Sequence, residues 1–264
     1  MLLKLSSPGT GGFWELPILF EDEHLLALNK PAGLLTVADS EDPARPNLVG
    51  LLHQAIVEAK PWAKERAISF LMQAYRLDPE ASGVLLLARS KPMLTGLGDF
   101  FGAQRPSLSF ITLVQGSPLK NRFSVEAKLA PHPARPGLAR VHARHGKRSH
   151  TEFEVIESFA GWTLLKCAPL THRPHQIRVH AAYAGFPLAG DPAYGGKLLL
   201  LSSLKPGFQL KPHHTERPLI SSPCVHAEQL TLRHPATGGR LFINAPWPKD
   251  LEVAVKYLRK YSAP

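Results

Sequence analysis

The chain has 264 residues, of which 44% are hydrophobic and 20% charged, so it has the composition of a globular protein and is not disordered as a whole. No apolar run approaches the roughly 20 residues that span a membrane, and the first residues lack the apolar core of a secretion signal. The two cysteines, Cys167 and Cys224, stand alone, which excludes a disulfide scaffold and fits a reducing cytoplasm, where we expect the protein to reside.

Positive charge is the clearest bias of the composition, and it is unevenly distributed. The net charge is +10, from 31 Lys and Arg against 21 Asp and Glu. Residues 1–60 hold 4 basic and 8 acidic side chains, whereas residues 61–150 hold 14 basic and 5 acidic ones. Between Lys120 and His150, eight Lys or Arg accompany a single Glu, and His residues are interspersed. Such a stretch would attract a polyanion such as nucleic acid, although a solvated loop that keeps the protein soluble has the same composition.

Hydrophobic patterning predicts an α+β chain in which strands outnumber helices. Residues 1–17 are interpreted as an N-terminal extension, and 18–20 with 25–29 as a hairpin around an acidic turn. The other predicted strands are 84–89, 109–115, 123–128, 151–159, 162–168, 225–232 and 241–244. Because strands often follow one another directly, a mixed and mainly antiparallel sheet is favoured over a doubly wound parallel one.

Four helices are predicted, at 48–60, 93–104, 174–184 and 249–261. Asn47 could cap the first of them. In the third, Pro174 would occupy the first helical position, where its missing N–H costs nothing, and Gly185 would follow the last turn. Segment 131–137 breaks the strand pattern, and 197–223 is a Pro-, Leu- and His-rich irregular insertion. We therefore expect one domain over residues 18–264 that contains this insertion.

The segment 75–83, Tyr-Arg-Leu-Asp-Pro-Glu-Ala-Ser-Gly, lies between two apolar runs. Loops held between rigid strands are where catalytic groups tend to lie, and Asp78 has Arg76 close by. An ordinary turn is the alternative, because Asp before Pro initiates turns by bonding to its own backbone. Asp78 and Asp191 could also be the carboxylate pair of a glycosidase, but nothing in their spacing favours this over structural roles. Neither a GxGxxG nor a P-loop motif is present, so a nucleotide cofactor receives no support.

Residues 171–180, Thr-His-Arg-Pro-His-Gln-Ile-Arg-Val-His, form the densest polar segment. The three His suggest a metal site, but His175 and His180 would diverge by about 140° on a helix, and no carboxylate or thiol accompanies them. Anion binding at the start of the helix, aided by Arg173 and Arg178, fits better. Arg178 would lie one turn into the helix, where it could pair with Asp78 and hold that acid ionised.

Taken together, these segments resemble the RluA-type pseudouridine synthases. The family's NKPAG stretch is similar to residues 29–33, its H-R-L-D-x-x-T-S-G loop to 75–83, and its Y-x-A-x-V-x-G strand to 109–116. Its T-G-R-x-H-Q-I-R-V-H segment is similar to 171–180. Its later G-F-P, G-D-P…Y-G, H-A and H-P patterns are similar to residues 185–187, 190–195, 226–227 and 234–235. The matches keep their order over residues 18–250, which is nearly the whole chain.

The resemblance implies a pseudouridine synthase fold, with a mainly antiparallel bent sheet flanked by helices and an RNA cleft between two lobes. It also implies isomerisation of uridine in tRNA or rRNA to pseudouridine, without a metal or a cofactor. Asp78 then takes the position of the essential aspartate, as nucleophile or as base toward the sugar, and Arg178 that of its arginine partner. Arg76 would enter the RNA helix in place of the flipped nucleotide. The remaining substrate-binding positions are Phe110, Arg173, His175 and Gln176.

Four positions depart from the family pattern: Tyr75 replaces the usual His, Ala81 the usual Thr, His172 the usual Gly, and Phe110 the usual Tyr. Phenylalanine keeps a face that stacks on the uracil but lacks the hydroxyl that could transfer a proton. Two alternatives stay open, an RNA-binding protein that has lost activity and a metal-dependent nuclease that uses the His-rich segment. Residues 120–150 would grip RNA phosphates, and we expect a monomer without an obligatory protein partner.

Overall fold

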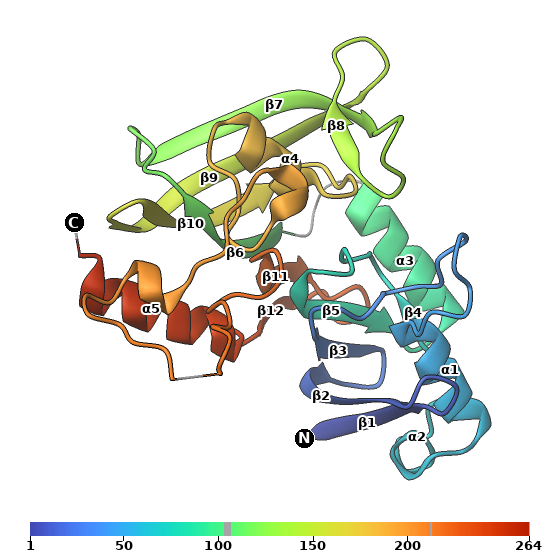
Figure 1. The fold of residues 1–264 in the computed structure, drawn as a ribbon. Coiled ribbons are helices and arrows are strands. Elements are labelled where there is room, and N and C mark those ends of the chain that lie inside the picture. The colour runs from blue at the N-terminus through green and yellow to red at the C-terminus, as the bar shows by residue number, and fades with distance from the viewer. Residues whose placement is uncertain (103–106, 212, 264) are drawn as a thin grey trace. The chain divides into compact units, whose positions relative to one another are not determined.

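The computed structural model of the chain describes residues 1–102, 107–211 and 213–263. They fall into two compact units, whose elements are labelled in Figure 1. Unit 1 comprises Met1–Leu108 and Ala227–Pro246, and unit 2 comprises Ser109–His226 and Trp247–Pro264. Each unit therefore draws on two separate stretches of chain, and residues near the C-terminus complete both.

Unit 1 is built on a sheet in which β1, β2, β3, β5 and β11 follow one another, while β4 adds to β5 and β12 to β11. The strands span Leu2–Ser7 (β1), Gly12–Glu21 (β2), Leu25–Lys30 (β3), Met72–Gln73 (β4), Ser82–Ala88 (β5), His226–Arg233 (β11) and Arg240–Asn244 (β12). The predicted hairpin is confirmed as the antiparallel pair β2–β3. The residues interpreted as an N-terminal extension form β1 and the first part of β2, which pair with each other.

Two strands in the middle of this sheet form its core. Residues 25–28 of β3 and 84–88 of β5 have no exposed surface, as expected for strands that are covered on both faces and therefore apolar throughout. They pair antiparallel, from Leu25 opposite Ala88 to Lys30 opposite Gly83. This register places Lys30 next to the start of β5, where the loop that carries Asp78 ends.

The described residues of unit 1 include the helices α1 (Leu48–Val57), α2 (Pro61–Glu65) and α3 (Lys91–Gly102). Asn47 caps α1 as predicted, since its Oδ1 accepts a hydrogen bond from the N–H of Gly50 at 2.8 Å. The prediction of a helix to residue 60 was too long, because Ala59 takes a left-handed φ of 50°. The predicted helix 93–104 is confirmed as α3 up to Gly102; residues 103 and 104 lie outside the described part of the chain.

Unit 2 contains the strand order β6-β10-β9-β7-β8, with neighbours antiparallel. The strands span Ser107–Gln115 (β6), Arg122–Pro131 (β7), Ala139–Val141 (β8), Lys147–Phe159 (β9) and Trp162–Pro169 (β10). The four strands predicted in this region are confirmed, and Gly161, at φ 79°, makes the turn from β9 to β10. The sequence did not predict β8: the segment 131–137, interpreted as a break, leads from β7 into this short strand, whose Val141 pairs with Leu129.

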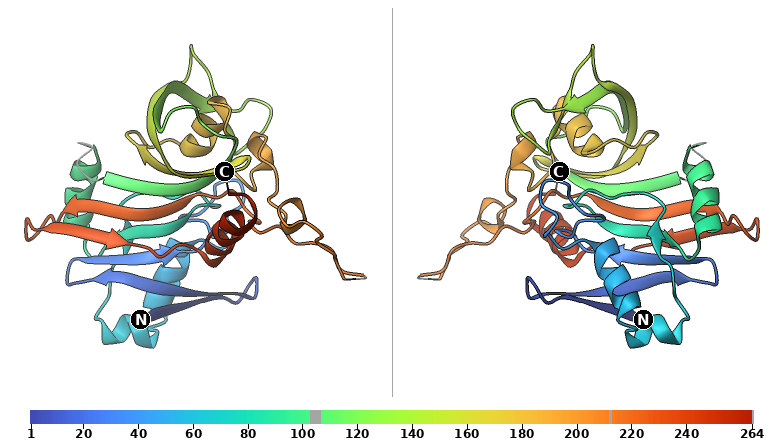
Figure 2. Two further views of the ribbon diagram at one scale, coloured as in Figure 1. Left: turned by 90° about the vertical axis from the view of Figure 1, so that its left-hand side faces the viewer. Right: turned by 90° about the vertical axis from the view of Figure 1, so that its right-hand side faces the viewer.

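The helices in the described part of unit 2 are α4 (Gln176–Tyr183) and α5 (Lys249–Tyr261), with the short 3₁₀ helices η1 (Pro192–Tyr194) and η2 (Leu201–Ser203). The bounds predicted for α5 are confirmed, and its apolar stripe, which includes Leu251 and Leu258, packs in one buried cluster with Ile111 of β6 and Leu164 of β10. The insertion 197–223 is a long loop beside α5 (Figure 2), with η2 as its one regular element among the described residues. No helix in the described ranges is both long and apolar enough to cross a membrane.

Candidate active site

Asp78 lies in the loop that connects β4 to β5 in unit 1. The side chain of Arg76 is exposed, Leu77 is buried and Asp78 is partly buried. Two hydrogen bonds hold the loop at Leu77: the buried hydroxyl of Thr36 donates to its carbonyl at 2.8 Å, and its N–H donates back to that Oγ1 at 3.3 Å. The N–H of Ala81 donates to the carbonyl of Asp78 at 3.0 Å and closes the turn. The carboxylate of Asp78 is thus carried by a fixed backbone.

The end of the same loop requires glycine. Gly83 has φ 107°, which side-chain-bearing residues rarely adopt, and a Cβ at this position would lie 2.2 Å from the carbonyl oxygen of Ala227. Both residues belong to unit 1, so β11 backbone packs directly against the start of β5.

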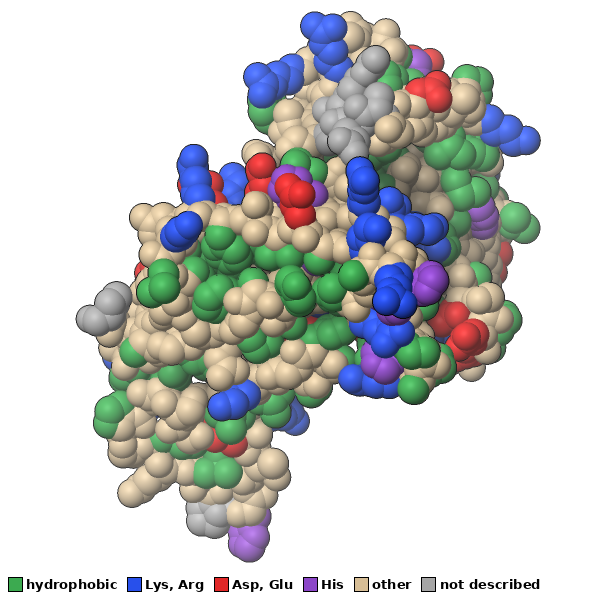
Figure 3. Space-filling model, turned by 90° about the horizontal axis from the view of Figure 1, so that it is seen from above, with side chains coloured by type: hydrophobic (Ala, Val, Ile, Leu, Met, Phe, Trp, Pro, Cys, Tyr) green, Lys and Arg blue, Asp and Glu red, His purple; other side chains and the backbone are tan. Residues whose placement is uncertain are grey.

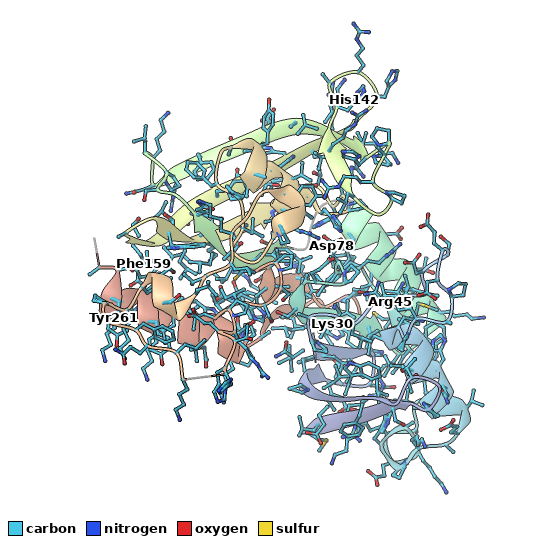
Figure 4. All side chains as sticks on the ribbon, in the orientation of Figure 1. Lys30, Arg45, Asp78, His142, Phe159 and Tyr261 are labelled. Atoms are coloured by element: carbon cyan, nitrogen blue, oxygen red, sulfur yellow. The ribbon has the colours of Figure 1, made fainter. Side chains whose placement is uncertain are left out.

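Lys30 supports the loop from the end of β3, and the sequence assigned it no role. Its side chain has no exposed surface. Its Nζ donates to the carbonyl oxygens of Pro31 at 2.9 Å, Leu34 at 2.6 Å and Pro79 at 3.2 Å. Because Pro79 directly follows Asp78 in the chain, this third hydrogen bond holds the backbone next to Asp78. Lys30 and Asp78 are both labelled in Figure 4. Burial lowers the pKa of Lys30 to about 7, although the carboxylates of Asp78 and Glu80 raise it.

Tyr75, one of the departures from the family pattern, anchors the start of this loop. Its hydroxyl donates to the carbonyl of Val84 on β5 at 2.7 Å, and its ring centroid lies 5.1 Å from that of Phe101 on α3. Burial raises the pKa of the Tyr75 hydroxyl, so the phenol keeps its proton. The tyrosine therefore ties the loop to the sheet and to α3.

The polar segment 171–180 lies in unit 2, and its helix begins later than predicted. α4 starts at Gln176 rather than at Pro174, because His175 takes a left-handed φ of 55° at the N-cap position. The reason is tertiary: this conformation accompanies a 2.8 Å hydrogen bond between Nδ1 of His175 and Oη of Tyr194 in η1. The predicted end is confirmed, since Gly185 follows the helix with φ 88°.

Arg178 and Asp191 form a buried ion pair in unit 2. Nε of Arg178 donates to Oδ2 of Asp191 at 2.7 Å and Nη2 donates to Oδ1 at 2.9 Å, a bidentate arrangement. Their side chains are 4% and 0% exposed. The guanidinium also lies 5.0 Å from the centroid of the Tyr194 ring. Asp191 thus compensates the charge of Arg178 and holds the plane of its guanidinium, a contact that the sequence did not predict. The predicted pairing of Arg178 with Asp78 stays a prediction.

The other predicted substrate-binding residues of unit 2 differ in what holds them. Gln176 is buried; its amide donates to the carbonyl of His150 at 3.0 Å and to Oγ1 of Thr151 at 2.9 Å, and its Oε1 accepts from Thr171 at 2.8 Å. These contacts tie the start of α4 to β9. Arg173 is half-buried, and its Nε atom has no exposed surface. Phe110 is buried on β6 opposite Cys167 of β10.

The basic stretch predicted to grip RNA forms the end of β7, the strand β8 and the start of β9. Its cations are exposed: Lys128, Arg135, Arg140, Arg144, Lys147 and Arg148. Figure 4 labels His142 in this region, and Figure 3 shows Lys, Arg and His side chains gathered on the face seen from above. Clustered positive side chains concentrate potential that attracts phosphates.

No three His, Cys, Asp or Glu side chains converge on a possible metal position within residues 1–102, 107–211 and 213–263. In the segment 171–180, two of the three histidines that were considered as ligands face different partners. His175 bonds to Tyr194, and Nδ1 of His180 lies 2.9 Å from Oγ1 of Thr151. The His-rich segment is therefore used to pack α4 against its neighbours in unit 2.

Comparison with known proteins gives one consistent answer. Residues 24–183 match the family model described as RNA pseudouridylate synthase. The ribosomal large subunit pseudouridine synthase C of Salmonella typhi is 34% identical over 244 residues, which cover 92% of this chain and 70% of that protein. The ribosomal large subunit pseudouridine synthase D of Xanthomonas campestris is 32% identical over 248 residues, which cover 94% and 71%.

Two human structures share the fold. The protein called RNA pseudouridylate synthase domain containing 4 matches with a TM-score of 0.65 at 20% identity, over 92% of each chain. Its relative, domain containing 1, matches with a TM-score of 0.60 at 19% identity, over 94% of this chain and 96% of that one. The mainly antiparallel sheet with helices is thus the pseudouridine synthase fold. From these matches, the chain belongs to the RluA family of RNA pseudouridine synthases, which are isomerases.

Proposed function

We propose that this enzyme converts specific uridines of large-subunit ribosomal RNA to pseudouridine, with Asp78 as its essential carboxylate. The bacterial relatives are named as ribosomal large subunit pseudouridine synthases, and the similarity extends over more than nine tenths of this chain. The observation that carries the proposal is the mounting of Asp78: a partly exposed carboxylate on a loop that is fixed by Thr36, Tyr75 and the buried Lys30.

The reaction sets what the site must do. The bond between N1 of uracil and C1′ of the ribose breaks, the base turns, and a bond between C5 and C1′ forms. C5 loses a proton and N1 gains one, so the reaction involves no net oxidation and needs no redox cofactor. A carboxylate can attack C1′ or remove a proton from the sugar. Asp78 would act in one of these two ways, and either requires the target nucleotide to leave the helical stack first.

Two arginines would serve this step differently. Arg178 would pair with Asp78 and keep it ionised; a guanidinium has five N–H donors, so it can bind Asp191 and a second carboxylate at once. The bidentate contact to Asp191 supports this role, because it holds the guanidinium in one orientation. Arg76 is exposed beside Asp78, which suits a side chain that fills the space left by the extruded nucleotide.

Phe110, Arg173 and His175 would contribute to substrate binding. Phe110 offers an aromatic face for the uracil, and Arg173 a cation for a phosphate. Gln176 would act as a positioning residue instead, since its amide already serves three groups of the protein. The exposed cations from Lys128 to Arg148 would hold RNA phosphates away from the reacting base.

The decisive experiment uses unmodified transcripts of large-subunit rRNA and of tRNA, with pseudouridine mapped at nucleotide resolution. The wild-type enzyme should modify defined uridines of the rRNA, and Asp78→Asn should reduce the rate by at least about a thousandfold. Asp42→Asn is the matched control, because Asp42 is an exposed aspartate of the same unit, and it should retain the wild-type rate.

Each other outcome identifies a different error. Normal turnover by Asp78→Asn would remove Asp78 from its essential role. Modification of the tRNA alone would show that the substrate is tRNA and not large-subunit rRNA. Tight RNA binding by wild-type protein without any pseudouridine would favour the RNA-binding protein that has lost activity. Mapping of cellular RNA after deletion of the gene, followed by complementation with Asp78→Asn, would test the same assignments in the cell.

A further inference from the structure

The hairpin of β11 and β12, which projects near α3 in Figure 2, is organised as a two-faced element in unit 1. Its inner face is apolar: Leu230 pairs with Ile243 and Leu232 with Leu241. The outer face consists of three cross-strand pairs, which are Gln229 with Asn244, Thr231 with Phe242, and Arg233 with Arg240. The apolar face explains why the hairpin folds, but it does not explain what stands on the outer face.

Two features of the outer face are unfavourable in an isolated protein. Arg233 and Arg240 stand directly opposite each other, and like charges in this arrangement repel. Neither has a carboxylate within ion-pair distance among the residues that the structure describes. Phe242 is 51% exposed, although it is a large apolar side chain. A ligand that brings negative charge and a flat apolar surface would relieve both costs.

The arginines also line a groove. A hollow of about 670 Å³ lies between the end of α3 and the hairpin, and its walls include Phe100, Ser107, Thr231, Arg233 and Arg240. The guanidinium of Arg240 lies 4.6 Å from the centroid of the Phe242 ring, so a cation and an aromatic face adjoin each other beside this groove. A positively charged groove next to an exposed aromatic ring is the combination that binds single-stranded nucleic acid.

The turn that carries the arginines is held rigidly. Nδ1 of His234 accepts hydrogen bonds from the N–H groups of Ala236 and Thr237, both at 3.2 Å, so the ring proton is on Nε2. Nε2 in turn donates to Oδ2 of Asp22, in the turn between β2 and β3, at 2.8 Å. Oδ1 of Asp22 accepts the N–H groups of His24 and Leu25 at 2.8 and 2.7 Å. The hairpin end is thereby fixed to a second hairpin, which keeps the two arginines in register.

We infer that the outer face of the β11–β12 hairpin is a second RNA-binding site, which holds a single-stranded segment of the substrate outside the Asp78 loop. Phosphates lie on Arg233 and Arg240, and one base stacks on Phe242. The amides of Gln229 and Asn244, which bond to each other at 2.8 Å, provide polar edges beside the base. The inference rests on the proposed function in that it takes RNA as the substrate.

The test measures binding of a fluorescent single-stranded oligouridylate over a series of KCl concentrations, and turnover on rRNA separately. Arg233→Ala/Arg240→Ala should weaken binding and flatten the slope of log K against log salt by about 1.4, because each phosphate contact to a single strand contributes about 0.7. The control is Lys249→Ala/Lys256→Ala, which removes the same charge from exposed positions of α5 and should leave the slope near that of the wild type.

Substitutions at Phe242 test the stacking of a base separately from the binding of phosphates. Phe242→Ser should weaken oligouridylate binding by at least about fivefold, and Phe242→Trp should retain it, because stacking needs only an aromatic face. Inorganic polyphosphate, which has no bases, should bind the Phe242→Ser variant as well as it binds wild type. Thermal melts of all variants check that they fold, which is expected for exposed positions.

The outcomes separate this inference from the proposed function. If wild-type enzyme modifies rRNA but the arginine and Phe242 variants bind like the control, the second site is wrong and the proposed function stands. An arginine effect without a Phe242 effect would show a site for polyanions only, and would overturn stacking of RNA. If the wild type modifies no RNA, the oligouridylate measurements still decide whether the hairpin binds RNA.

Discussion

Among the described residues, each unit buries one lysine or arginine, and the two are held in opposite ways. Lys30 in unit 1 has no exposed surface and directs its Nζ to three backbone carbonyl oxygens. Arg178 in unit 2 is 3% exposed and forms a bidentate ion pair with Asp191, which has no exposed surface. The first cation is hydrogen-bonded to neutral carbonyl dipoles, and the second to a full counter-charge.

This difference suits the two segments they support. An amine can give up its proton, and burial lowers the pKa of Lys30 to about 7, so the support of the Asp78 loop changes its charge near neutral pH. A guanidinium keeps its proton in proteins, so burying Arg178 demands a carboxylate beside it. A change of pH therefore alters the charge of Lys30, which supports the Asp78 loop in unit 1. The charge of Arg178 in unit 2 loses its compensation only when Asp191 is removed.

The largest effect is expected from Asp191→Asn. It keeps the shape of the side chain but leaves the guanidinium of Arg178 buried without its counter-charge, which costs about 3–5 kcal/mol. Urea denaturation measures the loss. Glu157→Gln is the control, since Glu157 pairs with Arg259 at 2.8 Å in partly exposed positions and should change stability by less than about 1 kcal/mol. A variant Asp191→Asn that unfolds at the wild-type urea concentration would mean that the buried pair does not hold unit 2 together.

A smaller effect, with a distinctive pH dependence, is expected from Lys30→Met. The unfolded chain binds a proton at Lys30 up to a pKa of about 10.4, whereas the folded protein releases it near a pKa of about 7. Between these values the unfolded state holds more protons, so this residue makes the free energy of unfolding rise with pH. Below about pH 7 the contribution is at its least favourable. The variant should lack this rise.

The measurement compares urea denaturation of wild type and Lys30→Met at about pH 6, 8 and 10, so that other titrating groups cancel in the difference. Lys64→Met is the matched control, because Lys64 is exposed in α2 of the same unit and should follow the wild-type curve. Parallel curves for Lys30→Met and wild type would show that the amine keeps its proton in the fold. The two buried cations would then not differ in the way proposed.

The sequence predicted those parts of the fold whose signals are local. The helix predicted at 249–261 agrees with α5 to the residue, and Asn47 marked the start of α1. Each of these depends on neighbours within a few positions along the chain. The order of the motifs, rather than any one of them, led to the family, which the comparisons confirm.

What the sequence missed depends on residues that are distant along the chain. The start of α4 was misplaced because His175 is bound by Tyr194, 19 residues away. Lys30 received no role because one of its acceptors, Pro79, lies 49 residues away. Asp191 was considered as one of two glycosidase carboxylates and as part of the family's G-D-P pattern, but not as a partner of Arg178, because that contact is set by η1 folding against α4. No periodicity or spacing encodes such contacts.

The smallest expected effect concerns the surroundings of Arg178 rather than its charge. Tyr194→Phe keeps the ring at the guanidinium but removes the Oη that accepts the N–H of Ala139 at 2.9 Å and bonds His175 at 2.8 Å. The buried N–H of Ala139 then lacks its acceptor, which costs about 1–2 kcal/mol in urea denaturation. Tyr183→Phe, at a position that is 63% exposed, is the control and should leave the free energy of unfolding unchanged.

Since the ion pair between Arg178 and Asp191 remains in Tyr194→Phe, the rate of pseudouridine formation should fall less than in Asp191→Asn. An equal or larger loss of activity would place the control of Arg178 in the Tyr194 hydroxyl network and not in its counter-charge.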